Sequence, residues 1–71
     1  MKYKNISLID RLKPHYKQIL EKQNLKFPEI VGQISQDLEN VSFVTDLKYK
    51  TVLELSFILG SKNPFIYFKD K

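Results

Sequence analysis

Asp46–Ser61, with the sequence DLKYKTVLELSFILGS, decides the fold of this chain because it fits two kinds of secondary structure. A strand alternates its side chains between two faces, whereas a helix repeats about every 3.6 residues. From Val41 to Leu59 the odd positions are apolar apart from two threonines, and all charged side chains occupy even positions. We therefore predict that this part of the chain is extended.

An extended run of this length must be divided, because strands in globular proteins rarely exceed about ten residues. We expect strands at about 41–45 and 49–59, separated by a break near Thr45–Lys48 that is either a short hairpin or a bulge. The turn-forming letters GSKNP then precede FIYF, which is aromatic and predicts a third strand at about 64–69. Whether Lys2–Ile6 adds a further strand is left open.

Two amphipathic helices are expected before the strands, at about 8–23 and 28–39. Pro14 interrupts the first pattern, so we expect either a kink or a helix that begins near Lys13. Pro28 suits the first position of the second helix, where its missing N–H costs nothing. Gly32 lies inside that helix, and we interpret it as a site of close approach to the first helix.

The predicted fold is α+β in a single domain that covers residues 1–71. Its N-terminal two-helix hairpin packs on one face of a three-stranded antiparallel β-meander. A chain of 71 residues buries a small core, which often needs disulfides, a metal or a partner chain. The sequence contains no cysteine, so a partner chain is the most available of these aids.

The residue types present argue against enzymatic activity. His15 is the single histidine, and Asp10 and Glu21 are poorly spaced along a helix to orient it as a general base. The two glycines, Gly32 and Gly60, cannot form a glycine-rich phosphate loop. We expect no cofactor, no metal and no small-molecule substrate. With no long apolar segment or signal-peptide pattern, we also expect no membrane association and a cytoplasmic location.

The charge is unevenly distributed around a net value of +4. Residues 1–26 carry seven basic and two acidic side chains, and residues 27–47 carry four acidic side chains and no Lys or Arg. A basic helix can contact phosphate groups and bind nucleic acid in a salt-sensitive way. The candidate nucleic-acid-binding residues are Lys2, Lys4, Arg11, Lys13, Lys17, Lys22 and Lys26.

The C-terminal aromatic strand is the candidate protein-binding element. A single sheet face cannot bury both sides of FIYF, and a terminal strand with a free edge can pair with another chain. The candidate residues are Val52, Ser56, Ile58, Phe65, Ile66, Tyr67 and Phe68. We therefore expect a small, non-enzymatic protein that acts on a protein partner or forms a homodimer, as a regulator or inhibitor of phage or plasmid type does. Nucleic-acid binding through the first helix is the alternative.

If residues 49–61 form a helix instead of a strand, they resemble part of a known protein family. As a helix, YKTVLELSFILGS (residues 49–61) resembles the late helix of Cro/CI-type helix-turn-helix repressors, and ILEKQNLKFPEIVGQIS (19–35) resembles the start of such a domain. The resemblance implies a DNA-binding transcriptional regulator. Between Ser35 and Thr51, however, too little chain remains for the turn, the recognition helix and the loop that follows it. We do not adopt this family for that reason. On a helical wheel the apolar residues of 47–59 also scatter around the whole circumference, so we favour the strand interpretation.

Overall fold

A computed structural model describes residues 6–69, and this part of the chain is helical without any strand. Its elements, in order, are α1 (Leu8–Arg11), α2 (Pro14–Gln23), α3 (Pro28–Asn40), the 3-10 turn η2 (Val44–Asp46), α4 (Tyr49–Leu59) and the 3-10 turn η3 (Pro64–Tyr67). The α+β prediction is therefore wrong. The stretches expected as strands at 41–45, 49–59 and 64–69 form η2 and its flanks, α4 and η3. The open question of a strand over Lys2–Ile6 falls mostly outside the described residues.

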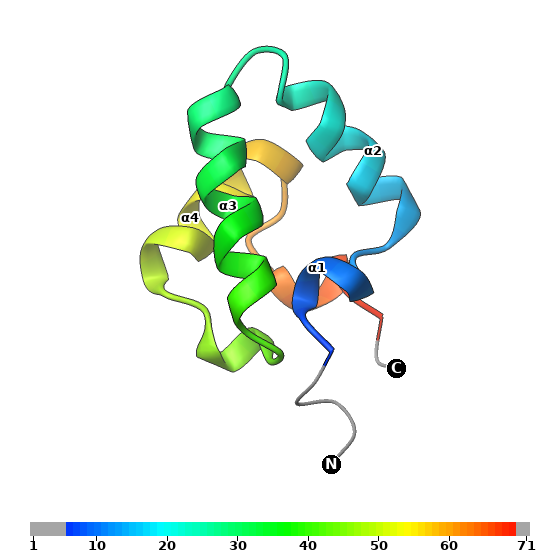
Figure 1. Cartoon of the computed structure of the whole chain (residues 1–71), viewed down its shortest axis with the longest axis vertical. Helices are drawn as coiled ribbons and strands as arrows, with labels where there is room; N and C mark the ends of the chain where they lie inside the picture. The colour runs from blue at the N-terminus through cyan, green and yellow to red at the C-terminus, as the bar shows by residue number, and fades with distance from the viewer. Residues whose placement is uncertain (1–5, 70–71) are drawn as a thin grey trace.

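Helix α3 lies at the centre of the fold and packs against α1, α2 and α4 (Figure 1). Helix α4 also contacts α2 and η3. The core consists of eleven buried side chains from all of these helices, from η3 and from two residues adjoining them: Leu8, Leu12, Leu20, Val31, Ile34, Leu38, Leu55, Ile58, Leu59, Tyr67 and Phe68. The face that the two-helix hairpin leaves uncovered is thus closed by another helix and not by a sheet.

Helix α4 is the main correction to the sequence prediction. It begins after Lys48 and ends at Gly60, which adopts a left-handed conformation with φ of 93°. Glycine adopts this conformation without the steric penalty of a Cβ atom, so it is the usual residue to end a helix in this way. The N–H of Gly60 donates to the carbonyl of Ser56, which completes the last turn. Leu59 and Gly60 therefore end a helix, where we had expected the end of a strand.

The region that contains Pro14 is a break between two helices and not a kink within one. Helix α1 ends at Arg11, and α2 begins at Pro14, whose ring fits the first turn. The extended residues between them pair with the end of the chain through one isolated bridge, Leu12 with Phe68. Lys13 N–H donates to the Tyr67 carbonyl at 2.9 Å, and Lys69 N–H donates to the Arg11 carbonyl at 2.8 Å. This pairing fixes the C-terminal segment beside α1 (Figure 1).

Helix α3 spans Pro28–Asn40, where we expected a helix at about 28–39. It buries Val31, Ile34 and Leu38 on one side. The close approach expected at Gly32 is wrong, because an added Cβ atom would meet nothing within 4 Å and the residue is exposed.

The aromatic letters FIYF form η3 because the preceding residues start a turn there. The Asn63 side chain accepts a hydrogen bond from the Phe65 N–H at 3.1 Å, and Pro64 occupies the first position of the turn. The tight turn sends Tyr67 and Phe68 into the core and leaves Phe65 exposed. The free strand edge predicted here therefore does not exist.

Candidate protein-binding surface on α4

Three large apolar side chains lie in one row on the solvent side of α4. Tyr49 is 78% exposed, Leu53 is 51% exposed and Phe57 is 64% exposed. They follow one another at intervals of four residues, so they stack along one face of the helix. We call these three residues the outward stripe. Apolar residues scattered singly are normal on a protein surface, whereas a contiguous row makes this face a candidate binding surface.

The outward stripe is produced by the same alternation that suggested a strand. Residues two apart on a helix are separated by about 200°, so every second residue falls on nearly opposite sides. An apolar residue at every odd position therefore forms two rows. Thr51, Leu55 and Leu59 form the row that is buried in the core. Tyr49, Leu53 and Phe57 form the outward stripe. Helix α4 is thus apolar on two opposite faces. The core of the single chain buries one of them, and the other is exposed.

The two sides of the outward stripe differ in charge. Lys50 and Glu54 flank it on the side of α3, where they line a polar cleft with Asp37 of that helix. Val52 and Ser56 flank it on the other side, and both are uncharged and half-buried. At the C-terminal end, the ring of Phe27 packs edge-on against Phe57 with the ring centres 5.4 Å apart. This contact holds Phe57 in place while more than half of its surface stays accessible.

The residues predicted to bind protein are dispersed by the helical fold. Ile58, Tyr67 and Phe68 are buried, and Val52, Ser56 and Ile66 are half-buried. Of the seven, Phe65 alone is exposed. None of the three residues of the outward stripe was among them, although their spacing of four residues is visible in the sequence. The buried row Thr51, Leu55 and Leu59 has the same spacing, so the packing of α4 was needed to identify the exposed row.

Tyr67 has a structural role in the core. Its hydroxyl donates to the carbonyl of Ser61 at 2.6 Å and accepts from the N–H of the same residue at 2.8 Å. Burial of the phenol raises the pKa of Tyr67 above its ordinary value of 10.0. These bonds fix the loop between α4 and η3 against the core.

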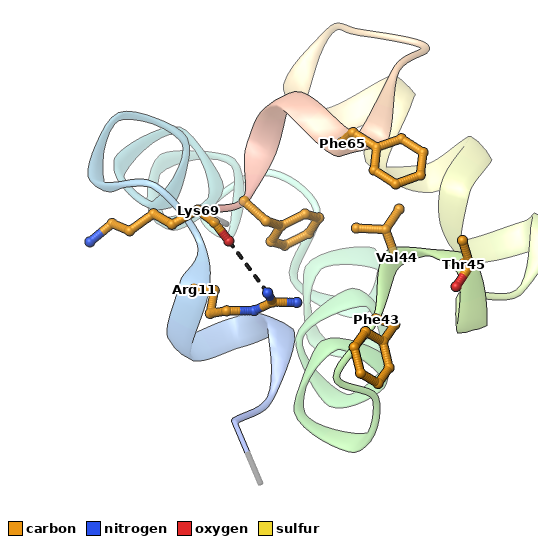
Figure 2. A pocket seen from close by; sticks show the side chains of 7 residues that line it. Arg11, Phe43, Val44, Thr45, Phe65 and Lys69 are labelled. Atoms are coloured by element: carbon orange, nitrogen blue, oxygen red, sulfur yellow. Dashed lines mark hydrogen bonds between the residues drawn. The ribbon is translucent and has the colours of Figure 1, made fainter. Parts of the chain in front are cut away.

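A second aromatic surface surrounds Phe65. An open pocket of about 200 Å³ is lined by Arg11, Phe43, Val44, Thr45, Phe65, Phe68 and Lys69. Figure 2 shows Val44 opposite the Arg11 guanidinium, with Phe65 on one side of Val44 and Phe43 on the other. The guanidinium donates to the carbonyl of Ser42 and, at 3.4 Å, to the carbonyl of Lys69. Arg11 therefore ties together three segments of the chain at the wall of the pocket.

The predicted nucleic-acid-binding residues are only partly assembled into a face. Lys13, Lys17, Lys22 and Lys26 are exposed on α2 and at its two ends. Arg11 points to the backbone carbonyls described above, and Lys2 and Lys4 lie outside the described residues. Glu21 is exposed among these lysines. Between Asn40 and Tyr49 the chain forms only η2, so no helix occupies the place of the recognition helix of a repressor.

Within residues 6–69, no three His, Cys, Asp or Glu side chains come close enough together to hold a metal ion. His15 is exposed on α2 and contacts the ring of Tyr16, with the ring centres 5.0 Å apart. Asp37 accepts a hydrogen bond from the Thr51 hydroxyl at 2.5 Å. Over the same range, no helix has the length and apolar character needed to cross a bilayer.

Comparison with known proteins gives no match to any protein-family model, curated protein or solved structure.

Proposed function

We propose that this chain is a small, non-enzymatic protein that binds another protein through the outward stripe of α4. The proposal is carried by one observation: Tyr49, Leu53 and Phe57 form a contiguous exposed row on a helix whose opposite face is already buried. Two of the three are aromatic, and aromatic side chains supply much of the binding energy in protein interfaces. The bound protein is either a different chain, as for a regulator or an inhibitor, or a second copy of this chain.

Site-specific photocrosslinking in the producing cells tests the proposal. A benzophenone side chain in place of Tyr49, which is 78% exposed, is expected to crosslink to a bound protein. Leu53→Glu in the same chain is expected to abolish the crosslink, because a carboxylate in the stripe cannot be buried without a partner.

Two controls make this test specific. Leu25→Glu makes the same change at a residue that is 86% exposed in the turn after α2, and it is expected to leave the crosslink intact. A benzophenone at Phe65, which is 59% exposed, reports on the second aromatic surface. Crosslinks from position 65 without any from position 49 would contradict the proposal.

Nucleic-acid binding through α2 is the second candidate function. Four exposed lysines, Lys13, Lys17, Lys22 and Lys26, favour it. Such binding would weaken steeply with salt, because each phosphate that a lysine neutralises releases counterions. The two candidates are separated by size-exclusion chromatography with and without generic duplex DNA, at low and moderate salt.

If the chain binds protein and not nucleic acid, its elution volume should be the same with and without DNA. If DNA is retained instead, Lys13→Gln combined with Lys17→Gln should lower the slope of log affinity against log salt by about 1.8 in magnitude. Retention with that change in slope would favour the second candidate.

A further inference from the structure

The outward stripe is symmetric about its central residue. Leu53 lies four residues after Tyr49 and four residues before Phe57, so an aromatic ring stands at equal distance on either side of it. A two-fold axis that passes near Leu53 would therefore place Leu53 against its own copy. The same axis would place each Tyr49 beside Phe57 of the second copy. Interfaces between identical chains are usually of this kind, because the same patch must complement itself.

The charges beside the stripe favour the antiparallel direction of such a pair. Lys50 and Glu54 lie on the same flank, toward α3, and the opposite flank carries no charge. When two helices pack antiparallel, like flanks meet, so Lys50 of each copy faces Glu54 of the other. In a parallel pair the charged flank would instead face the uncharged Val52 and Ser56. Charge pairs of this kind set the orientation of an interface more than its affinity.

The exposed area indicates a weak interface. From the size of aromatic side chains and their exposed fractions, the outward stripe presents roughly 350 Å². A stable interface buries about 800 Å² on each partner, and smaller ones are usually transient. The outward stripe alone therefore supplies less than half of the area of a stable interface. A dimer formed this way should therefore depend on protein concentration in the micromolar range or above.

We infer that the partner of the outward stripe is a second copy of this chain, bound through antiparallel α4 helices about a two-fold axis near Leu53. The inference rests on the proposed function and names the partner of that same surface. The stripe is buried between the two copies, and two Lys50–Glu54 pairs close one flank.

Analytical ultracentrifugation across protein concentrations from about 10 to about 500 µM tests the inference. The wild-type chain should shift from monomer to dimer within this range. Leu53→Glu should remain monomeric, and Leu25→Glu should dimerise like the wild type. Circular dichroism of the variants confirms that the helices are retained, as expected for changes at exposed positions.

A charge-exchange experiment tests the antiparallel geometry. Lys50→Glu and Glu54→Lys should each weaken dimerisation about tenfold, because each places like charges opposite each other at both ends of the interface. The double variant restores opposite charges and should dimerise within about threefold of the wild type. If the double variant stays as weak as either single variant, the antiparallel arrangement is wrong.

The outcomes separate this inference from the proposed function. A wild-type chain that stays monomeric at every concentration overturns the dimer. If the benzophenone at position 49 then crosslinks to a different protein, the stripe still binds protein and the proposed function stands. If it crosslinks to nothing, both are overturned. A crosslinked species of twice the mass of the chain supports both.

Discussion

Tyr67 shows how one side chain secures the end of this fold. Its ring is buried against Tyr16, with the ring centres 4.8 Å apart, and its hydroxyl bonds to both backbone groups of Ser61. The phenol must stay protonated to donate to the Ser61 carbonyl. Because burial raises its pKa, the folded state binds this proton more tightly than the unfolded state does. The stabilisation is complete below the unfolded-state pKa and is lost as the pH rises above about 10.

Tyr67→Phe is therefore expected to lower the free energy of unfolding by about 1–2 kcal/mol at neutral pH, because it removes the hydroxyl and leaves Ser61 without its partner. The difference between wild type and variant should shrink as the pH rises above about 10, because the phenol then ionises in the unfolded state while burial still raises its pKa in the folded state. Urea denaturation of both proteins across this range measures the difference. A constant difference would show that Tyr67 does not titrate with folding.

Thr51 is a buried polar residue that joins α4 to α3. It is 1% exposed, and its hydroxyl donates to the carboxylate of Asp37. Thr51→Val preserves the shape and removes the hydroxyl, so we expect a loss of about 1 kcal/mol in stability, limited because Asp37 is partly solvated. A double-mutant cycle with Asp37→Ala isolates the contribution of the bond. Additive effects of the two changes would mean that the bond contributes nothing.

At the scale of elements, the sequence predicted the two N-terminal helical segments and the importance of Pro14 and Pro28. It failed at α4, where the odd-numbered apolar residues fit a strand and a helix with two apolar faces equally well. Most helices in small proteins have one apolar face. We assumed this for residues 49–59 and therefore did not choose the helix. Gly60 as a helix end was the local observation that favoured a helix. The turn that begins η3 could also be recognised in the sequence, because Asn63 and Pro64 are typical turn residues.

The outward stripe could not be separated from the core by sequence alone. The rows Thr51–Leu55–Leu59 and Tyr49–Leu53–Phe57 have the same spacing, and both contain large apolar residues. Only the packing of α4 on α2 and α3 determines which row is buried. The buried row contains the polar Thr51, whose hydroxyl is satisfied by Asp37. A buried polar group with a distant partner cannot be recognised before that partner is placed.

The end of α4 at Gly60 can be tested by an alanine substitution, with the same substitution at Gly32 inside α3 for comparison. Gly60→Ala should destabilise the chain by about 1 kcal/mol, because alanine is strained at a φ of 93°. Gly32→Ala should stabilise it by about 0.5–1 kcal/mol, since the residue is within α3 and the added methyl group meets open space. Thermal unfolding of the two variants measures both effects. Equal effects of the two substitutions would contradict the assigned end of α4.

At the scale of the whole molecule, a small core and an exposed apolar face point in the same direction. A chain of 71 residues gains little stability from its own core, and burial of the outward stripe in a dimer would add to it. We therefore expect the melting temperature of the wild type to rise with protein concentration. Leu53→Glu should melt at a temperature independent of concentration. Scanning calorimetry over a tenfold or greater dilution series compares them, and a wild-type midpoint that does not move would contradict the coupling of folding to assembly.

The central claim is that Tyr49–Leu59 is a helix with two apolar faces, because the proposed binding surface depends on that conformation. The most direct measurement is the NMR chemical shift of each Cα atom in this segment, compared with its random-coil value. We expect downfield deviations over the whole of 49–59 and an abrupt end to them at Gly60. Upfield deviations typical of an extended backbone would remove the helix, and the outward stripe with it.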